Sequence, residues 1–143
     1  MLGHTAVSQL KPGGPISDFL LAVEAVYWGY VTYPYIRSYF DPPKTFEELR
    51  HNTKPGYDNH HIVEQWAEED GMPRNKVQSP ENIVPIPKLK RWEINKWLGE
   101  PNPEYKNGKN EEISPREYVR GKSWETRYQF GLDALKDFGL IKQ

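Results

Sequence analysis

The sequence predicts an α+β fold that is mainly helical, and three observations support this prediction. Several segments carry helix start signals or apolar residues at three- and four-residue steps. Two short extended runs, at 60–63 and 82–86, are bounded by turn residues, and a helical pattern follows the second run directly. With 143 residues, the chain is long enough for one compact domain and too short for two ordinary ones.

The N-terminal third is expected to be a lead-in followed by a helix. Residues 1–15 are rich in Gly and Pro, and residues 16–30 are apolar on most helical faces, which is typical of a buried helix. This apolar stretch is too short for a membrane span. Residues 33–40 are aromatic and irregular, so we expect no regular element there. We therefore interpret 1–43 as a lead-in and a helix that packs on a domain formed by 44–143.

The middle of the chain predicts a strand, a second strand and a helix. A capping box from Thr45 to Glu48 opens a short helix before them. The two extended runs should pair as one small sheet, with Pro85 placed at a free edge. The helix should run from 88 to 98, with Leu89, Trp92 and Trp97 as apolar anchors.

The C-terminal part predicts a surface loop and two more helices. Residues 102–112 are polar and contain an Asn-Gly pair, which is typical of an exposed loop. Ser114 to Glu117 is a capping box with Pro at the first helical position. The last helix should begin near Ser123 and stop at Gly139.

Composition excludes some chemistry and leaves an uneven charge distribution. The absence of Cys excludes disulfides, thiolate metal sites and Cys nucleophiles. The net charge is −1, but residues 1–70 carry five Lys and Arg against ten Asp and Glu, and residues 71–130 carry twelve against eight. Only the second half could therefore supply a basic face for a polyanion, and ordinary solvated surface is the alternative.

The residues that could carry chemistry cluster in the predicted strand-strand-helix region. His60 and His61 are adjacent in an extended run, so their side chains should point to opposite faces. One could face a metal and the other a substrate, or one could be core and the other exposed. Asn82 lies at the head of the second run, and residues 91 and 95 share one face of the helix that follows.

Residues 56–98 closely resemble the HNH, or His-Me finger (ββα-metal), nucleases that form C-terminal toxin domains of bacterial polymorphic toxins, including Rhs-type and type VI secretion effectors. The resemblance rests on His-His-Ile-Val-Glu-Gln at 60–65, Pro-Glu-Asn-Ile-Val at 80–84 and Trp-Glu-Ile-Asn at 92–95. It extends through Ser-Pro-Arg-Glu-Tyr at 114–118 and Gly-Lys-Ser-Trp at 121–124. It implies a small ββα-metal core surrounded by helices.

The resemblance also implies roles for individual residues. His61 would be the general base that takes a proton from the attacking water, because the ordinary pKa of an imidazole lies near neutrality. His60 and Asn95 would be metal ligands. Asn82 would orient the loop that holds His61, by side-chain hydrogen bonds to the backbone.

The sequence departs from the family pattern at Arg91, where such nucleases usually have a His. A guanidinium cannot bind a cation, because it is always protonated and has no lone pair to donate. A site of three imidazoles is therefore not expected, and Mg²⁺, which keeps several waters, is preferred over Zn²⁺ or Ni²⁺. Arg91 would then be a catalytic phosphate clamp, or its presence would abolish cleavage.

Other polar and aromatic residues receive simpler interpretations. The acidic run Glu64, Glu68, Glu69 and Asp70 is expected to be a solvated helix face, and Trp92 and Trp97 are expected to be packing residues. His4 and His51 have no supporting neighbours. Two alternatives remain for a set of basic residues, which could contact phosphates or be ordinary surface residues. The set consists of Lys88, Lys90, Lys96, Arg116, Arg120 and Lys122.

The resemblance finally implies a biological setting. The domain would be an endonuclease acting on DNA, secreted by the producing bacterium without a signal peptide of its own and active in the cytoplasm of a target cell. It would need a cognate immunity protein and no stable membrane partner. The alternatives are an RNase of the same fold, or a catalytically silent domain that binds nucleic acid or a protein.

Overall fold

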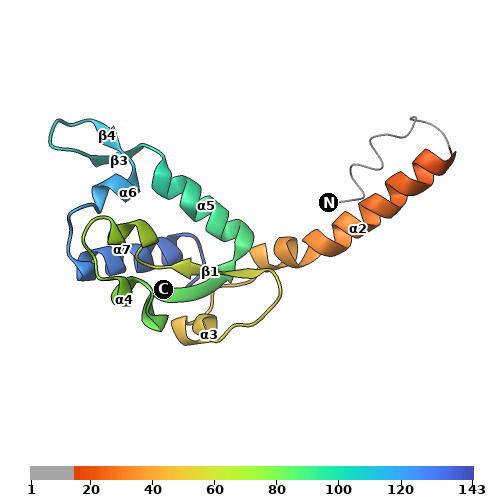
Figure 1. Cartoon of the computed structure of the whole chain (residues 1–143), viewed down its shortest axis with the longest axis horizontal. Helices are drawn as coiled ribbons and strands as arrows, with labels where there is room; N and C mark the ends of the chain where they lie inside the picture. Colours follow the sequence, from red (N-terminus) through yellow and green to blue (C-terminus); the bar gives the residue numbers. More distant parts are fainter. Residues whose placement is uncertain (1–14) are drawn as a thin grey trace.

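The computed structural model describes residues 15–143, and this part of the chain is α+β and mainly helical (Figure 1). The lead-in expected at 1–15 lies outside the described residues, apart from Pro15. The elements follow in this order: α2 (Pro15–Tyr39), α3 (Phe46–Arg50), β1 (Tyr57–His61), η1 (Gln65–Glu68), α4 (Arg74–Val77), η2 (Pro80–Asn82), β2 (Ile83–Pro87), α5 (Lys88–Gly99), β3 (Asn102–Lys106), β4 (Glu112–Ile113), α6 (Pro115–Tyr118) and α7 (Trp124–Asp137).

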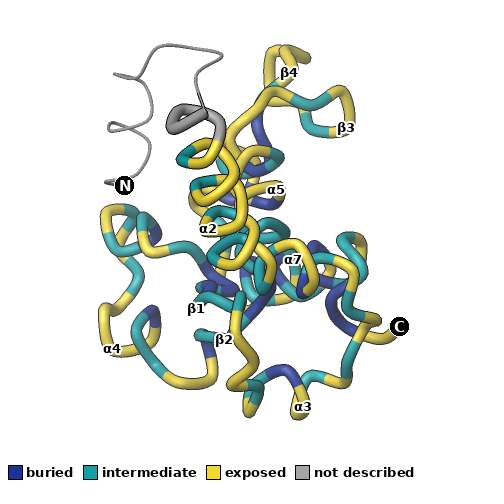
Figure 2. The backbone as a smooth tube through the Cα atoms, turned by 90° about the vertical axis from the view of Figure 1, so that its right-hand side faces the viewer, coloured by how far each residue is buried: buried dark blue, intermediate teal, exposed yellow. Residues whose placement is uncertain are grey.

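Helix α2 differs from both sequence expectations for this region. It continues to Tyr39, through a segment expected to be irregular, and Pro34 lies inside it. It is also not a buried helix, because it projects away from the other elements and most of its length is exposed (Figures 1 and 2). Phe19 is 67% exposed and Tyr30 is 82% exposed. Among the described residues, no helix is long and apolar enough to cross a membrane.

Among the described residues, only the C-terminal end of α2 packs on other elements. The Tyr39 hydroxyl donates a hydrogen bond to Glu93 Oε1 on α5 at 2.5 Å, and the Lys90 ammonium lies over the Tyr39 ring. The turn before β1 approaches α2 so closely that only Gly fits at position 56. A Cβ there would lie 2.3 Å from the Pro34 carbonyl oxygen, and Gly56 also has a φ of +88°.

Strands β1 and β2 form an antiparallel pair in which His60 faces Val84 and His61 faces Ile83. Strand β1 begins three residues earlier than the sequence predicts and ends at His61 instead of residue 63. Pro85 and Pro87 are tolerated in β2 because a two-stranded sheet leaves one edge of each strand free. Helix α5 follows β2 directly, as predicted.

The three predicted helix starts are confirmed by their side-chain caps. The hydroxyls of Thr45, Ser114 and Ser123 accept hydrogen bonds from backbone N–H groups three residues later. The expected loop at 102–112 is instead a small hairpin, β3–β4. Its two ends pair across a turn that contains Asn110 at a φ of 62°.

The core lies between the antiparallel pair β1–β2, α5 and α7. Trp97 packs against it and stacks on Phe130, as expected of a packing residue. Trp92 was expected to pack in the same way, but it is 56% exposed, because it lies on the face of α5 that is turned away from the core. The buried cluster consists of Leu49, Ile62, Val84, Ile86, Ile94, Leu98, Leu135, Leu140 and Ile141.

Candidate active site

An open cleft at the end of β1 brings together four of the five residues that the sequence singles out for catalysis or metal binding. Two of them come from β1 and two from α5. The fifth residue, Asn82, is buried beside the cleft. The lining residues of the cleft are His60, His61, Glu64, Gln65, Arg91, Asn95 and Arg116.

Asn82 is completely buried and makes the side-chain hydrogen bonds to backbone that the sequence predicts. Its Oδ1 accepts a hydrogen bond from the Val63 N–H at 2.8 Å. Its Nδ2 donates to the carbonyl oxygens of Val63, at 2.9 Å, and of Val77, at 2.8 Å. One carboxamide therefore ties the segment that follows β1 to the end of α4, and this fixes the backbone on both sides of His61.

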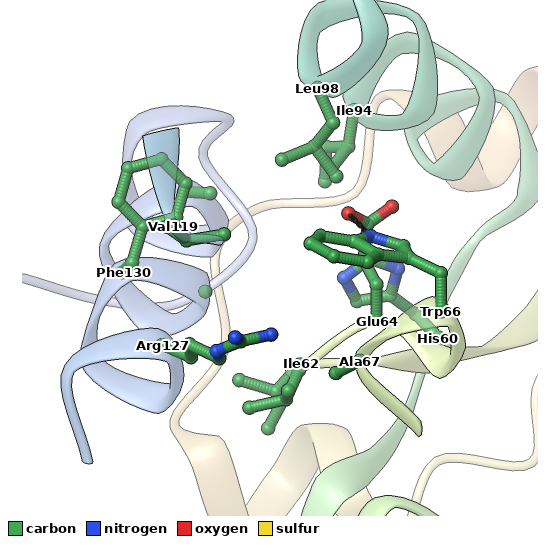
Figure 3. A pocket seen from close by; sticks show the side chains of 13 residues that line it. His60, Ile62, Glu64, Trp66, Ala67, Ile94, Leu98, Val119, Arg127 and Phe130 are labelled. Carbon is green, nitrogen blue, oxygen red and sulfur yellow. Dashed lines mark hydrogen bonds between the residues drawn. The ribbon is translucent and has the colours of Figure 1, made fainter. Parts of the chain in front are cut away.

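His60 is 5% exposed and lies between the cleft and a narrow internal cavity (Figure 3). Burial, together with electrostatic repulsion from Arg91 and His61, lowers the pKa of His60 to about 4. The imidazole is therefore neutral at physiological pH and keeps one nitrogen lone pair. Among the described residues, neither ring nitrogen has a hydrogen-bond partner.

The cavity behind His60 has a buried guanidinium on its opposite side. Figure 3 shows that Arg127, on α7, points into this cavity towards Trp66 and His60. Arg127 donates hydrogen bonds to Asp70 and to the Lys122 carbonyl oxygen. Its Nη1 is buried and has no partner among the described residues.

His61 is half-buried, and its ring is held by a side chain from the end of α4. The His61 Nε2 lies 3.1 Å from Gln78 Oε1. Gln78 Nε2 in turn donates to Glu68 Oε2 at 2.9 Å. The two adjacent histidines therefore have different surroundings, one enclosed by the core and one in a polar network, as expected for neighbours in an extended strand.

Arg91 lies in the cleft and is paired with a carboxylate that the sequence analysis did not single out. Its Nη1 donates to Asp58 Oδ2 at 2.8 Å, and the side chains of Arg91 and Asp58 are 32% and 42% exposed. Asp58 lies two residues before His60, so it shares that face of β1, and the period of a strand could have identified it. Asn95, one turn after Arg91, is exposed at the same cleft.

The sequence predicts that Glu64 belongs to a solvated helix face, and this prediction is wrong. Its side chain is only 16% exposed, and both of its oxygens accept hydrogen bonds from Arg116, which comes from α6. The Trp66 indole N–H also donates to Glu64, at 2.6 Å. The carboxylate is half enclosed by these donors, because α6 folds back over the segment that follows β1.

The predicted nucleic-acid contacts do not gather in one patch. The Lys88 ammonium lies over the rings of Tyr35 and Trp92, and Lys90 lies over the Tyr39 ring. Lys96 is exposed on α5, and Arg120 lies over the Trp66 ring.

The described residues contain no group of three or more His, Asp or Glu side chains arranged to hold a metal ion. The possible metal donors in the cleft lining are the imidazoles of His60 and His61 and the side-chain oxygens of Glu64, Gln65 and Asn95. The Glu64 carboxylate already accepts hydrogen bonds from Arg116 and Trp66. His51 is exposed and pairs with Glu47, away from the cleft, and His4 lies outside the described residues.

Gln78 and Glu68 are the site residues that no sequence signal could have identified. They reach His61 only because α4 and η1 fold against the end of β1. Comparisons of the chain with protein-family models, with curated proteins and with solved structures gave no match.

Proposed function

We propose that the cleft hydrolyses phosphodiester bonds with the help of a divalent metal, in the manner of the His-Me finger nucleases. One observation carries this proposal. The strand pair β1–β2 and the helix α5 direct His60, His61, Arg91 and Asn95 to the same cleft, although these residues span thirty-six positions of the chain.

The donor set fits a cation that retains most of its water. His60 can donate a lone pair because it stays neutral, and Asn95 offers a carboxamide oxygen. Mg²⁺ is bound in this way, through few protein ligands and several waters. The Arg91 guanidinium opposes cation binding, but its charge is compensated by Asp58. A metal held by His60 and Asn95 would supply Lewis-acid stabilisation of the phosphate.

The remaining residues would act on the water and the phosphate directly. His61 would accept the proton of the attacking water, which requires only that a neutral imidazole nitrogen faces the cleft. Arg91 would donate hydrogen bonds to the non-bridging phosphate oxygens, because an Arg presents several N–H donors in a fixed plane. Asn82 would hold the backbone that places His61.

The biological role that fits this activity is that of an antibacterial toxin domain. Such a domain would cleave DNA in the cytoplasm of a target cell, and a cognate immunity protein would protect the producing cell. The exposed basic residues Lys96 and Arg120 would contact phosphates without reading sequence.

The proposal is tested by a plasmid-cleavage assay with Mg²⁺, Mn²⁺, Ni²⁺ and Zn²⁺ in parallel, with a structured RNA as a second substrate. We expect cleavage of the plasmid with Mg²⁺ and a loss of about 10²–10⁴-fold in His61→Ala. His51→Ala is the matched control, because His51 is exposed and does not line the cleft. Wild-type rates in His61→Ala would refute the proposal, and cleavage of RNA alone would reassign the substrate.

A second candidate function is binding without cleavage, and the Asp58–Arg91 pair favours it. An arginine beside the His60 imidazole weakens cation binding at close range. A silent domain would bind DNA with a steep salt dependence and leave it intact with every metal.

A further inference from the structure

We infer that Gln78, held by Glu68, sets the tautomer of His61 so that Nδ1 is the nitrogen that accepts the proton of the attacking water. This inference rests on the proposed function, because it assigns an atom to the general base of that reaction. Gln78 is a positioning residue in it, since it acts through His61 and does not line the cleft itself.

The orientation of the Gln78 carboxamide follows from its second neighbour. A carboxylate offers only acceptors, so the Glu68 oxygen 2.9 Å away requires the NH₂ group of Gln78 to face it. The Gln65 carbonyl oxygen, 3.5 Å from the same NH₂ group, is also an acceptor. Both contacts direct the Gln78 carbonyl oxygen towards His61.

The tautomer of His61 follows from that orientation. A carbonyl oxygen can only accept, so the His61 Nε2 that lies 3.1 Å from it must carry the hydrogen. A neutral imidazole has one protonated and one unprotonated nitrogen, and Nδ1 is therefore the nitrogen with the lone pair. During hydrolysis, the water oxygen would form its bond to phosphorus and its proton would move to Nδ1. The bond from phosphorus to the leaving oxygen would break, its electron pair would stay on that oxygen, and a proton from solvent would neutralise it.

Hydrogen bonds to the backbone hold both Gln78 and the segment that follows His61 in place. Asn82 Nδ2 binds the carbonyl oxygen of Val77, the residue directly before Gln78, and Asn82 also binds both backbone groups of Val63. The Gln78 N–H donates to the Arg74 carbonyl oxygen at 2.9 Å, which closes α4. The buried Asn82 carboxamide thus fixes the backbone that follows His61 and the backbone that precedes Gln78.

The experiment measures the tautomer directly by two-bond ¹H–¹⁵N NMR spectra of the metal-free protein at about pH 8, where an ordinary imidazole is neutral. We expect a single Nε2–H tautomer for His61 in the wild-type chain. Gln78→Met keeps the length of the side chain and removes the acceptor, so both tautomers should appear. Gln129→Met, on the exposed face of α7, is the matched control and should leave His61 unchanged.

Cleavage and rescue distinguish positioning from a merely structural role. Gln78→Met should lower plasmid cleavage by about 10–100-fold, the usual effect of removing an orienting partner of a functional histidine, with little change in thermal unfolding. The exchanged pair Glu68→Gln with Gln78→Glu keeps the net charge and again presents an acceptor to Nε2. This double variant should restore the single tautomer and most of the cleavage.

Two results would overturn the inference. One is an Nδ1–H tautomer, or a mixture, in the wild-type chain, and the other is an unchanged His61 spectrum in Gln78→Met. The nuclease proposal fails separately: a wild-type chain that cleaves nothing with any metal, but has a single Nε2–H tautomer that depends on Gln78, refutes the reaction and leaves the role of Gln78 on the imidazole intact.

Discussion

Replacing the buried His60 by Gln should remove a large part of the acid sensitivity of the fold. The pKa of His60 is lowered to about 4, whereas a histidine in the unfolded chain titrates near 6.5. Burial is the main cause, because the protonated imidazole would lose its solvation inside the protein. Electrostatic repulsion from Arg91 and from the neighbouring His61 adds to the effect.

The direction and size of the effect follow from proton linkage. As the pH decreases from about 7 to 4, the unfolded chain binds a proton at His60 and the folded chain does not, so the free energy of unfolding decreases over this window. A difference of about 2.5 pKa units at 1.36 kcal/mol each corresponds to about 3 kcal/mol. This stability is fully present above pH 6.5 and is lost by about pH 4.

The assay is urea unfolding followed by Trp fluorescence, with a chelator present, at several pH values between about 7 and 4. Carboxylates titrate in the same range, but they contribute equally to the wild-type chain and to His60→Gln. The wild-type chain should therefore lose about 3 kcal/mol more than the variant across this range. His51→Gln is the control, because the His51 side chain is 78% exposed. Parallel pH profiles for wild type and His60→Gln would refute the reasoning.

Three further variants test other parts of the site. Asn82→Ala should lower the free energy of unfolding by about 3 kcal/mol in urea titrations, because three buried backbone groups lose their partner; a loss below about 1 kcal/mol would contradict this. Arg91→His should bind Ni²⁺ more tightly in calorimetry, because it adds an imidazole and removes a cation; an unchanged affinity would place residue 91 outside the metal site. Gly131→Ala should cost about 1–3 kcal/mol in thermal unfolding, because a Cβ there would lie 2.2 Å from the Ile62 carbonyl oxygen. Gly29→Ala, which meets no atom within 4 Å, should cost nothing measurable.

The sequence predicts best those features whose cause is local. The caps at Thr45, Ser114 and Ser123 are confirmed, because each hydroxyl and its N–H partner are three residues apart and meet whenever the helix forms. The order strand, strand, helix between Tyr57 and Gly99 is confirmed for a similar reason, since turn residues bound each run.

Features that depend on distant neighbours were predicted wrongly or missed. The apolar residues of α2 correctly predict a helix. The exposure of this helix depends on which other elements pack against it, and no local pattern contains that information. Glu64 was misread because its partner Arg116 lies fifty-two positions away. Gln78 was missed for the same reason, since its contact with His61 joins two segments that differ in element type.

The two arginines of the cleft differ in the number of donors that they have left for a substrate. Arg116 uses Nε and Nη2 on both oxygens of Glu64, a paired geometry that also raises the pKa of Arg116. Arg91 makes one hydrogen bond, from Nη1 to Asp58. A guanidinium has five N–H donors in a plane, so Arg91 keeps most of them for phosphate oxygens while Asp58 fixes its position. Arg116 therefore braces the wall of the cleft, and in the proposed reaction Arg91 would be the arginine that holds the substrate.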